Sequence, residues 1–354
     1  MTHLFTPLTQ RGLTFRNRIV VSPMCQYSST DGFANDWHTV HLVSRAVGGA
    51  GLVLTEAAAV EPRGRITPQD LGIWKDDHIP ALAKIVALID GAGAVAGIQL
   101  AHAGRKASTT PPWEGGKAIA ADGDGWQPIA PSPIPFDASS PTPAALSRED
   151  IQQLIASFVQ ATQRSLEAGF KLIEIHAAHG YLLHEFLSPL SNQRQDEYGG
   201  SFENRIRLLQ EVVTAVRERL PDGYPLWVRL SATDWLENGW DVEQSIALSE
   251  KLKPLGIDLV DCSSGGILPG AKIPVGPGYQ TPLAERIRRE AAIATGAVGM
   301  ITSPSQADHI IRTEQADVVL LAREFLRDPY WALRAAKQLG HDIPTPVQYE
   351  RAWR

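Results

Sequence analysis

The chain has 354 residues but only two cysteines, Cys25 and Cys262. Both fall in segments that we predict to be the ends of separate strands, which argues against a disulfide framework and favours a cytoplasmic setting. No run of about 18 apolar residues occurs, so a membrane span is not expected. The first fifteen residues, "MTHLFTPLTQRGLTF", also lack the apolar core of a signal peptide.

The sequence is also poor in clustered positive charge. Its formal net charge is −6, and no basic block stands out along the chain. Because nucleic acids and anionic membrane surfaces attract basic patches, neither is expected as a partner. A small-molecule partner is therefore the expectation.

Short runs rich in Val, Ile and Leu recur along the whole chain and predict eight strands. Helical patterns fill most of the gaps, at 147–169, 201–220, 242–256 and 303–316. Alternating strands and helices imply parallel strands with right-handed crossovers, and eight units favour one α/β domain over 1–354, a (β/α)8 TIM barrel. An open, doubly wound sheet is the alternative. The predicted strands are 19–24, 51–60, 95–104, 171–179, 225–232, 258–265, 297–302 and 317–325.

Two segments lie outside this alternation. The leader 5–19 predicts an N-terminal hairpin that closes the bottom of the barrel. Residues 107–146, after the third strand, are rich in Pro, Gly and Ser. A loop of this length is usually functional or disordered, and its position puts it on the face where barrel active sites lie. We expect it to cap the site.

Polar residues at the carboxyl ends of the strands are the candidates for function, because a barrel interior is otherwise apolar. Period-2 alternation turns Ile173 and Ile175 toward the helices and Glu174 and His176 inward. Arg229 lies near the barrel axis, where a charge needs an anionic partner. No carboxylate is evidently placed to serve it, so we expect a bound anionic cofactor. The other candidates are Ser22, Cys25, Tyr27, Gln99, His102, His179 and Arg323.

His176 and His179 allow several readings. They could bind zinc with His102 or Glu174 as a third ligand, pack as hydrogen-bonded core residues, or donate to an anion. No cysteine pair has metal spacing and no HExxH motif occurs, so no metal is expected. His184, on the presumed following helix, is expected to be structural.

The ends of strands 7 and 8 are where barrels commonly hold phosphate. Gly299 would let backbone N–H groups approach an anion, and Arg323 would add a charge-assisted donor. Arg323 could equally be an ordinary surface ion-pair residue.

Several motifs together resemble one family. They are "SPMCQYSS", "EAAAVEPRGRIT", "GIQLAHAGRKA", "EIHAAHGYLLHEFLSPLSNQRQDEYGGSFENR", "WVRLSA", "DCSSG" and "PVQYERAW". The set is similar to the old yellow enzyme family of FMN-dependent ene-reductases, and the first and last motifs look like its thermophilic-like bacterial subclass. The resemblance covers nearly the whole chain.

The resemblance implies FMN at the carboxyl face of a (β/α)8 barrel. It implies substrate contacts by His176 and His179, which would donate to a carbonyl or nitro oxygen, with Tyr181 as the proton donor and Tyr27 positioning the substrate. Ala322 stands where the family would have Gly, which is tolerable if its φ is negative. The implied FMN contacts are Ser22, Pro23, Met24, Cys25, Ala57, Gln99, Arg229, Gly299, Ala322 and Arg323.

The implied reaction is a ping-pong reduction of activated C=C bonds in enones, maleimides or nitroalkenes. NAD(P)H would pass hydride to FMN and leave, and FMN would pass it to the substrate. The resemblance also implies that the tail, 341–354, carries Arg351 into the site of a neighbouring subunit, so a homodimer or homotetramer is expected.

Other enzymes stay open as alternatives at this point. A second FMN barrel, such as a dihydroorotate or tRNA-uridine enzyme, is one, although the acidic balance disfavours RNA. A zinc-dependent barrel hydrolase that uses the histidine pair is another. Two scattered cysteines cannot hold the iron–sulfur cluster of a dienoyl-CoA reductase relative.

Overall fold

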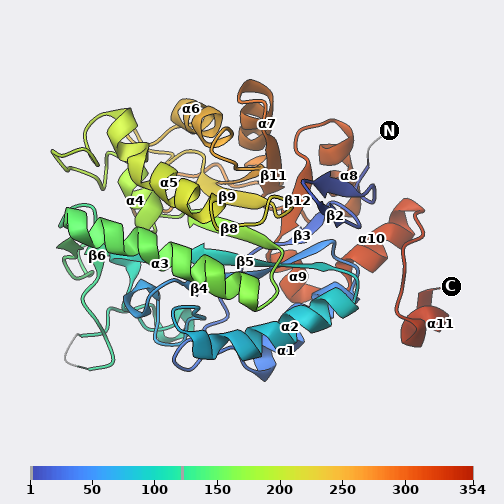
Figure 1. The fold of residues 1–354 in the computed structure, drawn as a ribbon. Coiled ribbons are helices and arrows are strands. Elements are labelled where there is room, and N and C mark those ends of the chain that lie inside the picture. Colours follow the sequence, from blue (N-terminus) through green and yellow to red (C-terminus); the bar gives the residue numbers. More distant parts are fainter. Residues whose placement is uncertain (1–2, 121–122, 354) are drawn as a thin grey trace.

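The protein folds as a closed parallel barrel (Figure 1). The structure, a computed structural model, describes residues 3–120 and 123–353. The last barrel strand pairs with the first, Val319 beside Ile19, so the doubly wound alternative is wrong and the TIM barrel is confirmed. The eight barrel strands are β3 (Ile19–Val21), β4 (Leu52–Ala59), β5 (Val95–Ala101), β8 (Leu172–Ala177), β9 (Leu226–Ser231), β10 (Leu259–Ser263), β11 (Ala294–Val298) and β12 (Val318–Leu321).

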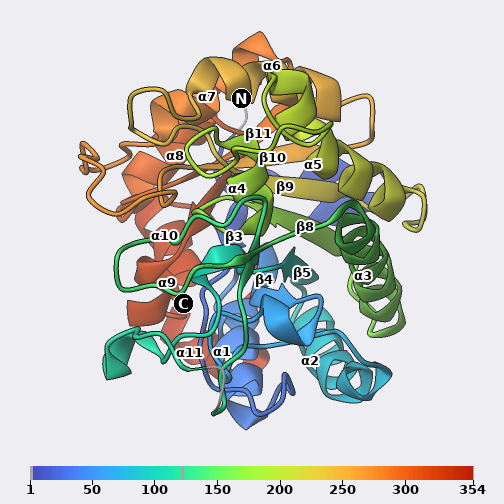
Figure 2. The ribbon, with the colours of Figure 1, turned by 90° about the vertical axis from the view of Figure 1, so that its left-hand side faces the viewer.

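Helices follow the barrel strands and form the outer ring (Figures 1 and 2). Four of them begin where the sequence predicts, because Ser147, Ser201, Asp241 and Ser303 each accept a hydrogen bond from the backbone N–H three residues on. The ring consists of α1 (Asp36–Val47), α2 (Ile79–Gly91), α3 (Arg148–Glu167), α5 (Phe202–Arg217), α6 (Val242–Leu252), α7 (Thr281–Glu290), α8 (Pro304–Arg312) and α10 (Trp331–Leu339).

The remaining elements are short and lie outside the barrel and its ring. They are β1 (Leu8–Gln10), β2 (Leu13–Phe15), β6 (Ile129–Ala130), β7 (Ala144–Ala145), α4 (Leu182–Leu187), α9 (Arg323–Arg327), α11 (Glu350–Trp353) and the 3₁₀ turns Pro62–Gly64, Asp76–His78, Gly104–Lys106, Pro112–Glu114 and Val347–Tyr349.

The seventh strand lies earlier than predicted. Its sequence bounds were 297–302, but β11 ends at Val298. Gly299 and Met300 have φ of 120° and 50°, which no strand can accommodate. The apolar residues that suggested a strand therefore belong to a loop at the carboxyl end of the barrel.

The N-terminal hairpin of β1 and β2 closes the bottom of the barrel, as predicted. The Phe15 ring lies 5.9 Å from the ring of Trp227 in β9, and Trp227 Nε1 donates a 2.7 Å hydrogen bond to Gln10 Oε1. Phe15 belongs to one buried cluster with Leu172 and Leu259 inside the barrel. The lower half of the interior is thus apolar and packed.

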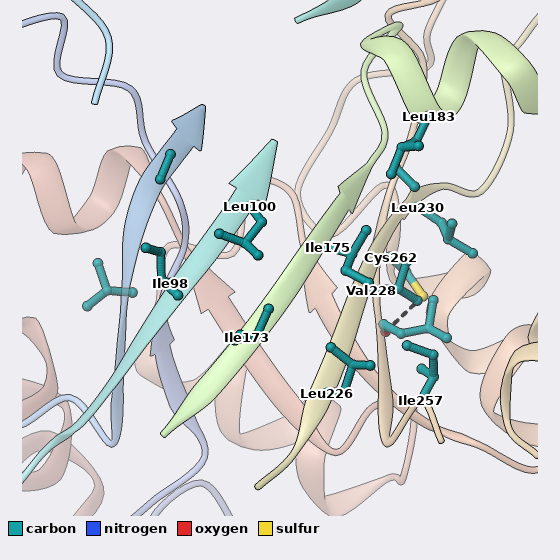
Figure 3. Close-up of a cluster of buried hydrophobic side chains, with 14 of the residues drawn as sticks. Ile98, Leu100, Ile173, Ile175, Leu183, Leu226, Val228, Leu230, Ile257 and Cys262 are labelled. Carbon is teal, nitrogen blue, oxygen red and sulfur yellow. Dashed lines mark hydrogen bonds between the residues drawn. The ribbon is translucent and has the colours of Figure 1, made fainter. Parts of the chain in front are cut away.

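The outer core confirms the alternation that the sequence predicts. Ile173 and Ile175 turn toward the helix layer together with Val228 and Leu230 of β9 (Figure 3). Cys262 joins this layer, where its Sγ contacts the carbonyl oxygen of Val260 at 3.4 Å. Because side chains alternate, Glu174 and His176 point into the barrel.

Within residues 3–120 and 123–353, none of the helices combines the length and apolar character that crossing a bilayer requires.

Substituting Phe15 tests the contribution of the hairpin to stability. Phe15 is only 2% exposed, so Phe15→Ala removes a buried ring and leaves a cavity, which should cost about 3–5 kcal/mol. The urea midpoint, followed by far-UV circular dichroism, should fall clearly. Thr14→Ala changes an exposed neighbour on the same strand and should shift stability by less than about 0.5 kcal/mol. Equal effects of the two variants would contradict a sealing role.

Candidate active site

A cavity of about 330 Å³ opens at the carboxyl ends of β3, β9, β10, β11 and β12. This size is typical of a small-molecule or cofactor site. The strand ends bring together seven of the residues singled out in the sequence, which come from five separate segments of the chain. These are Ser22, Pro23, His179, Arg229, Gly299, Ala322 and Arg323.

Arg229 at the floor of this cavity already has a carboxylate partner. Its Nε donates to Asp261 of β10, the residue directly beside it in the sheet register, and lies 3.8 Å from Glu174 Oε1. A terminal nitrogen donates to Ser22 Oγ at 2.8 Å. The expectation that no carboxylate serves Arg229 is therefore wrong. Alternation from Leu259, which packs inside the barrel, turns Asp261 inward toward Arg229.

His176, His179 and Tyr181 form one aromatic cluster at the end of β8. The His176 ring lies 5.2 Å from that of His179 and 5.1 Å from that of Tyr181, edge to face in both cases. Burial lowers the pKa of both imidazoles well below the usual range, and nearby Arg229 adds to this effect. Burial also raises the pKa of the Tyr181 phenol. At neutral pH the cluster therefore presents two uncharged imidazoles and a protonated phenol.

The backbone holds His179 in an unusual conformation. Its φ is 60°, its N–H donates to Ser231 Oγ at 2.9 Å, and its Nε2 lies 2.6 Å from Ser263 Oγ. Lys106 Nζ donates to the His179 carbonyl oxygen at 2.9 Å. Sequence reasoning missed both Ser263 and Lys106. Ser263 follows Asp261 at the inward spacing, whereas nothing in the sequence brings Lys106 here.

Tyr181 also borders the loop 107–146. It lines a cavity with Phe136, Asp137 and other residues of that loop, and Lys106 Nζ lies 5.0 Å from the centre of its ring. On another side it lines a small cavity with His176, Ala57 and Asp70. The long loop thus lies on the face that carries the cluster (Figure 2), and its capping role stays a prediction.

Eight of the predicted site residues do not line the large cavity. Burial raises the pKa of both the Cys25 thiol and the Tyr27 phenol, so both keep their protons. The Tyr27 ring meets that of Trp113, from the long loop, at 5.7 Å. Gln99 lies one layer below, where its Nε2 donates to Glu174 Oε1 at 2.8 Å. Residues of the predicted set that are absent from the cavity lining are Met24, Cys25, Tyr27, Ala57, Gln99, His176, Tyr181 and Arg351.

The backbone after β11 and β12 can accept an anion. A Cβ on Gly299 would lie 2.7 Å from Gln280 Nε2, and its φ is 120°, so only glycine fits. Ala322 has a φ of −105°, so this position does not require glycine. In the part of the chain that the structure describes, Arg323 has no carboxylate partner, whereas Arg327 pairs with Glu324 at 2.7 Å.

Both residues suggested as a third zinc ligand are engaged elsewhere. His102 Nε2 lies 2.8 Å from Glu61, and Glu174 is engaged by Gln99. Among residues 3–120 and 123–353, no group of three or more His, Cys, Asp or Glu residues is arranged to hold a metal ion. His184 accepts from the Gly180 N–H at 2.8 Å and its Nε2 lies 3.0 Å from Asp234, which confirms its structural role.

A barrel with this cavity, its arginines and a neutral His–His–Tyr cluster belongs to the class of barrel enzymes that bind an anionic cofactor. Residues 3–342 match the family described as "NADH:flavin oxidoreductase / NADH oxidase family". A relative from Geobacillus thermodenitrificans (strain NG80-2), "NADPH dehydrogenase", is 53% identical and aligns over 100% of this chain and 99% of its own length. The NADPH dehydrogenase of Bacillus subtilis (strain 168) is 51% identical over 99% of both chains.

Solved structures agree with these relatives. Morphinone reductase in complex with tetrahydroNAD superposes with a TM-score of 0.79 at 27% identity, covering 98% of this chain and 93% of that one. A 2-naphthoyl-CoA reductase gives a TM-score of 0.84 at 27% identity and covers 96% of this chain but 52% of the larger protein. The chain therefore belongs to the NADH:flavin oxidoreductase family. It is an NAD(P)H-dependent oxidoreductase of the old yellow enzyme type, and its cofactor is FMN.

The residues of the cavity fit FMN. Three arginines line it, Arg229, Arg323 and Arg327, against a single carboxylate side chain, Glu324, which suits a ligand that carries a phosphate. At Gly299 the backbone is accessible to a ligand, because no Cβ fills the space beside it. The apolar side chains of Val298, Leu320 and Leu321 complete the lining, as is usual for a cofactor site.

Gly299→Ala should weaken FMN binding. The new methyl group meets Gln280 and Tyr279, and the positive φ strains any side chain, so we expect Kd to rise by about tenfold or more. Quenching of FMN fluorescence on titration with apoprotein measures this. Gly276→Ala is the matched control, since a Cβ there meets nothing within 4 Å. A normal Kd for Gly299→Ala would mean that FMN does not approach this loop.

Proposed function

We propose that this enzyme reduces activated C=C bonds, in enones, maleimides or nitroalkenes, by a ping-pong reaction with NAD(P)H. The observation that carries the proposal is the cluster of buried His176 with half-buried His179 and Tyr181 beside the cofactor-sized cavity. Bound FMN would relay a hydride from NAD(P)H to the substrate. The protein would bind the substrate, polarise it and deliver a proton.

The histidine pair suits an oxygen that gains negative charge. Each neutral imidazole carries one N–H, and burial makes a hydrogen bond from it stronger than in water. Ser263 and Ser231 hold His179, so its donor is already oriented before reaction. A cluster of this kind would bind the carbonyl or nitro oxygen and stabilise the charge that develops on it.

Tyr181 is the proposed proton donor to the α-carbon. Its phenol keeps its proton at neutral pH because burial raises its pKa. The Lys106 ammonium near the ring would favour the phenolate that forms as the proton leaves. Tyr27 and the loop 107–146, in contact through Trp113, would enclose the substrate.

The proposed FMN contacts are those that the family resemblance implies, and six of the ten line the large cavity. The phosphate would lie at Gly299, Ala322 and Arg323, and Arg229 would face the pyrimidine end. Ser22, Pro23, Met24, Cys25, Ala57 and Gln99 would surround the ring system.

The C-terminal tail supports a shared site between subunits. Arg351 is exposed on α11, which lies on the opposite side of the molecule from β6 (Figure 1). An apolar groove between α1, α2 and the tail is lined by Val43, Val47 and Leu88, and Val347 beside it is 79% exposed. Exposed apolar surface of this kind marks an interaction site. A second copy of the chain would cover it and bring each Arg351 to its partner's pocket.

The first test is an anaerobic visible spectrum of the purified holoenzyme. NADPH should bleach the flavin absorbance, and 2-cyclohexenone should restore it. Bleaching without recovery on any enone, maleimide or nitroalkene would contradict the proposed substrate class.

Tyr181→Phe should slow only the second half-reaction. Loss of a general acid lowers the rate of enone reduction by about 10²–10⁴-fold, whereas reduction by NADPH needs no such proton and should stay within about twofold. Stopped-flow absorbance separates the two steps.

His176→Ala should slow enone reduction by about 10²–10³-fold. Tyr224→Phe, far from the cluster, is the control, and equal slowing of both half-reactions would contradict these roles.

Arg351→Ala should raise KM or lower turnover if the tail completes a partner's site. Mixing Arg351→Ala with Tyr181→Phe subunits should then restore activity, because a mixed dimer holds one site with both residues intact. Arg219→Ala, another exposed arginine, is the control. Unchanged kinetics of Arg351→Ala, or no restoration in subunits shown to exchange, would contradict the shared site.

A further inference from the structure

Directly beneath the cavity, a layer of buried polar side chains crosses the barrel. Arg229 of β9 lies between Glu174 of β8 and Asp261 of β10. Both carboxyl groups are fully buried, and Arg229 is 4% exposed. The apolar side chains of Leu172, Trp227 and Leu259 fill the barrel below. The two carboxyl groups thus have no access to bulk water from below.

This layer contains two carboxyl groups, of Glu174 and Asp261, and one guanidinium, of Arg229. Gln99 donates to Glu174 Oε1, and Ser22 accepts from Arg229, so β5 and β3 add only neutral groups. The titratable groups above are His176 and His179, whose pKa burial lowers, so neither supplies a positive charge. Two ionised carboxylates would leave one uncompensated negative charge in this layer. Such a charge is costly, and a proton bound by one acid removes it.

One oxygen of each acid is left without a donor. These are Glu174 Oε2 and Asp261 Oδ1, both inaccessible to solvent. The two carboxyl groups also lie within hydrogen-bond reach of one another. Two carboxylate oxygens cannot bond to each other unless one of them carries a proton. A single shared proton would therefore let one carboxyl group donate to the other.

We propose that Glu174 and Asp261 share one proton in the working enzyme, carried on Glu174, and that this proton sets the net charge of the Arg229–Glu174–Asp261 layer beneath FMN. The proposal rests on the proposed position of FMN beside Arg229. Asp261 takes the ionised role because Arg229 Nε contacts it directly and lies 3.8 Å from Glu174. Burial first, and then the charge of Asp261, raises the pKa of Glu174 to about 8.

The sign of the effect on FMN follows from charge. With the proton in place, the layer is neutral overall, and without it the layer carries one negative charge. Reduced FMN is more negative than oxidised FMN, so loss of the proton disfavours the reduced form. Because the bound proton favours reduced FMN, reduction in turn raises the pKa of the Glu174–Asp261 pair. At a pH between the pKa of the pair in the oxidised enzyme and its pKa in the reduced enzyme, reduction therefore draws a second proton from solvent. Glu174 and Asp261 are thus positioning residues that act on FMN through Arg229.

Infrared spectroscopy detects the proton without any catalytic turnover. The wild type minus Glu174→Gln difference spectrum should show a protonated carboxyl C=O band near neutral pH in both apoprotein and holoenzyme. This band should disappear as pH rises through about 8 in the apoprotein. Absence of the band at pH 7 would overturn the proposal. Glu185→Gln removes another buried acid, whose pKa is also raised to about 8 by burial, and serves as the control for band position.

The midpoint potential of the holoenzyme, measured from pH 6 to 10, tests the coupling to FMN. In the wild type, the plot of midpoint potential against pH should become steeper above pH 8. Its slope should change from that of one proton taken up per two electrons toward that of two protons. Each added proton corresponds to about 30 mV per pH unit, the two-electron equivalent of tenfold. Glu174→Gln should keep one proton throughout, because its amide can accept from Gln99 and donate to Asp261 as the protonated acid does. Glu185→Gln should steepen like the wild type.

Asp261→Asn covers the case in which Glu174→Gln fails to fold. It leaves one carboxyl group beside Arg229, so Glu174 should ionise and the steep section should vanish. A wild-type slope that never steepens, or steepening that persists in Glu174→Gln, would overturn the coupling. Failure of the proposed ene-reductase activity leaves these readouts unchanged, since neither depends on an alkene substrate.

Discussion

A buried guanidinium organises the carboxyl end of this barrel. Arg229 reaches Asp261 on one neighbouring strand and Ser22 directly after β3, so its charge and its hydrogen bonds are satisfied only if the strands stand in their native register. A slip of one residue in β9 would turn Arg229 toward the helices and leave Asp261 unpaired. The cost of that error helps to select one register, and the cavity above depends on it.

Burial both stabilises the barrel and sets the pKa values of the His176, His179 and Tyr181 side chains. The hairpin and Trp227 seal the barrel from below, and the helices exclude water from the sides. The resulting low polarity keeps the imidazoles of His176 and His179 uncharged and the phenol of Tyr181 protonated. The same exclusion of water that stabilises the fold therefore also fixes the protonation of these three groups.

Much of this arrangement could be predicted from the sequence, because periodicity carries it. Alternation around Ile173 and Ile175 correctly turned Glu174 and His176 inward. Two features could not be predicted from the sequence, for physical reasons. The strand predicted at 297–302 is interrupted by left-handed backbone at Gly299 and Met300, which apolar content does not reveal. The approach of Lys106 to Tyr181 depends on how the loop after β5 turns back over the barrel, and no local pattern encodes such a long-range contact.

The seam between β12 and β3 has a consequence for synthesis of the chain. Arg18 donates to the carbonyl oxygen of Asp317, 299 residues later, and Ile19 pairs with Val319. One edge of β3 therefore stays without its partner until almost the entire polypeptide has left the ribosome. An exposed parallel edge invites pairing with other chains, so the nascent protein passes through a long interval of vulnerability to aggregation. Its yield in cells should depend on how quickly about the last tenth of the chain, from β12 onward, is synthesised.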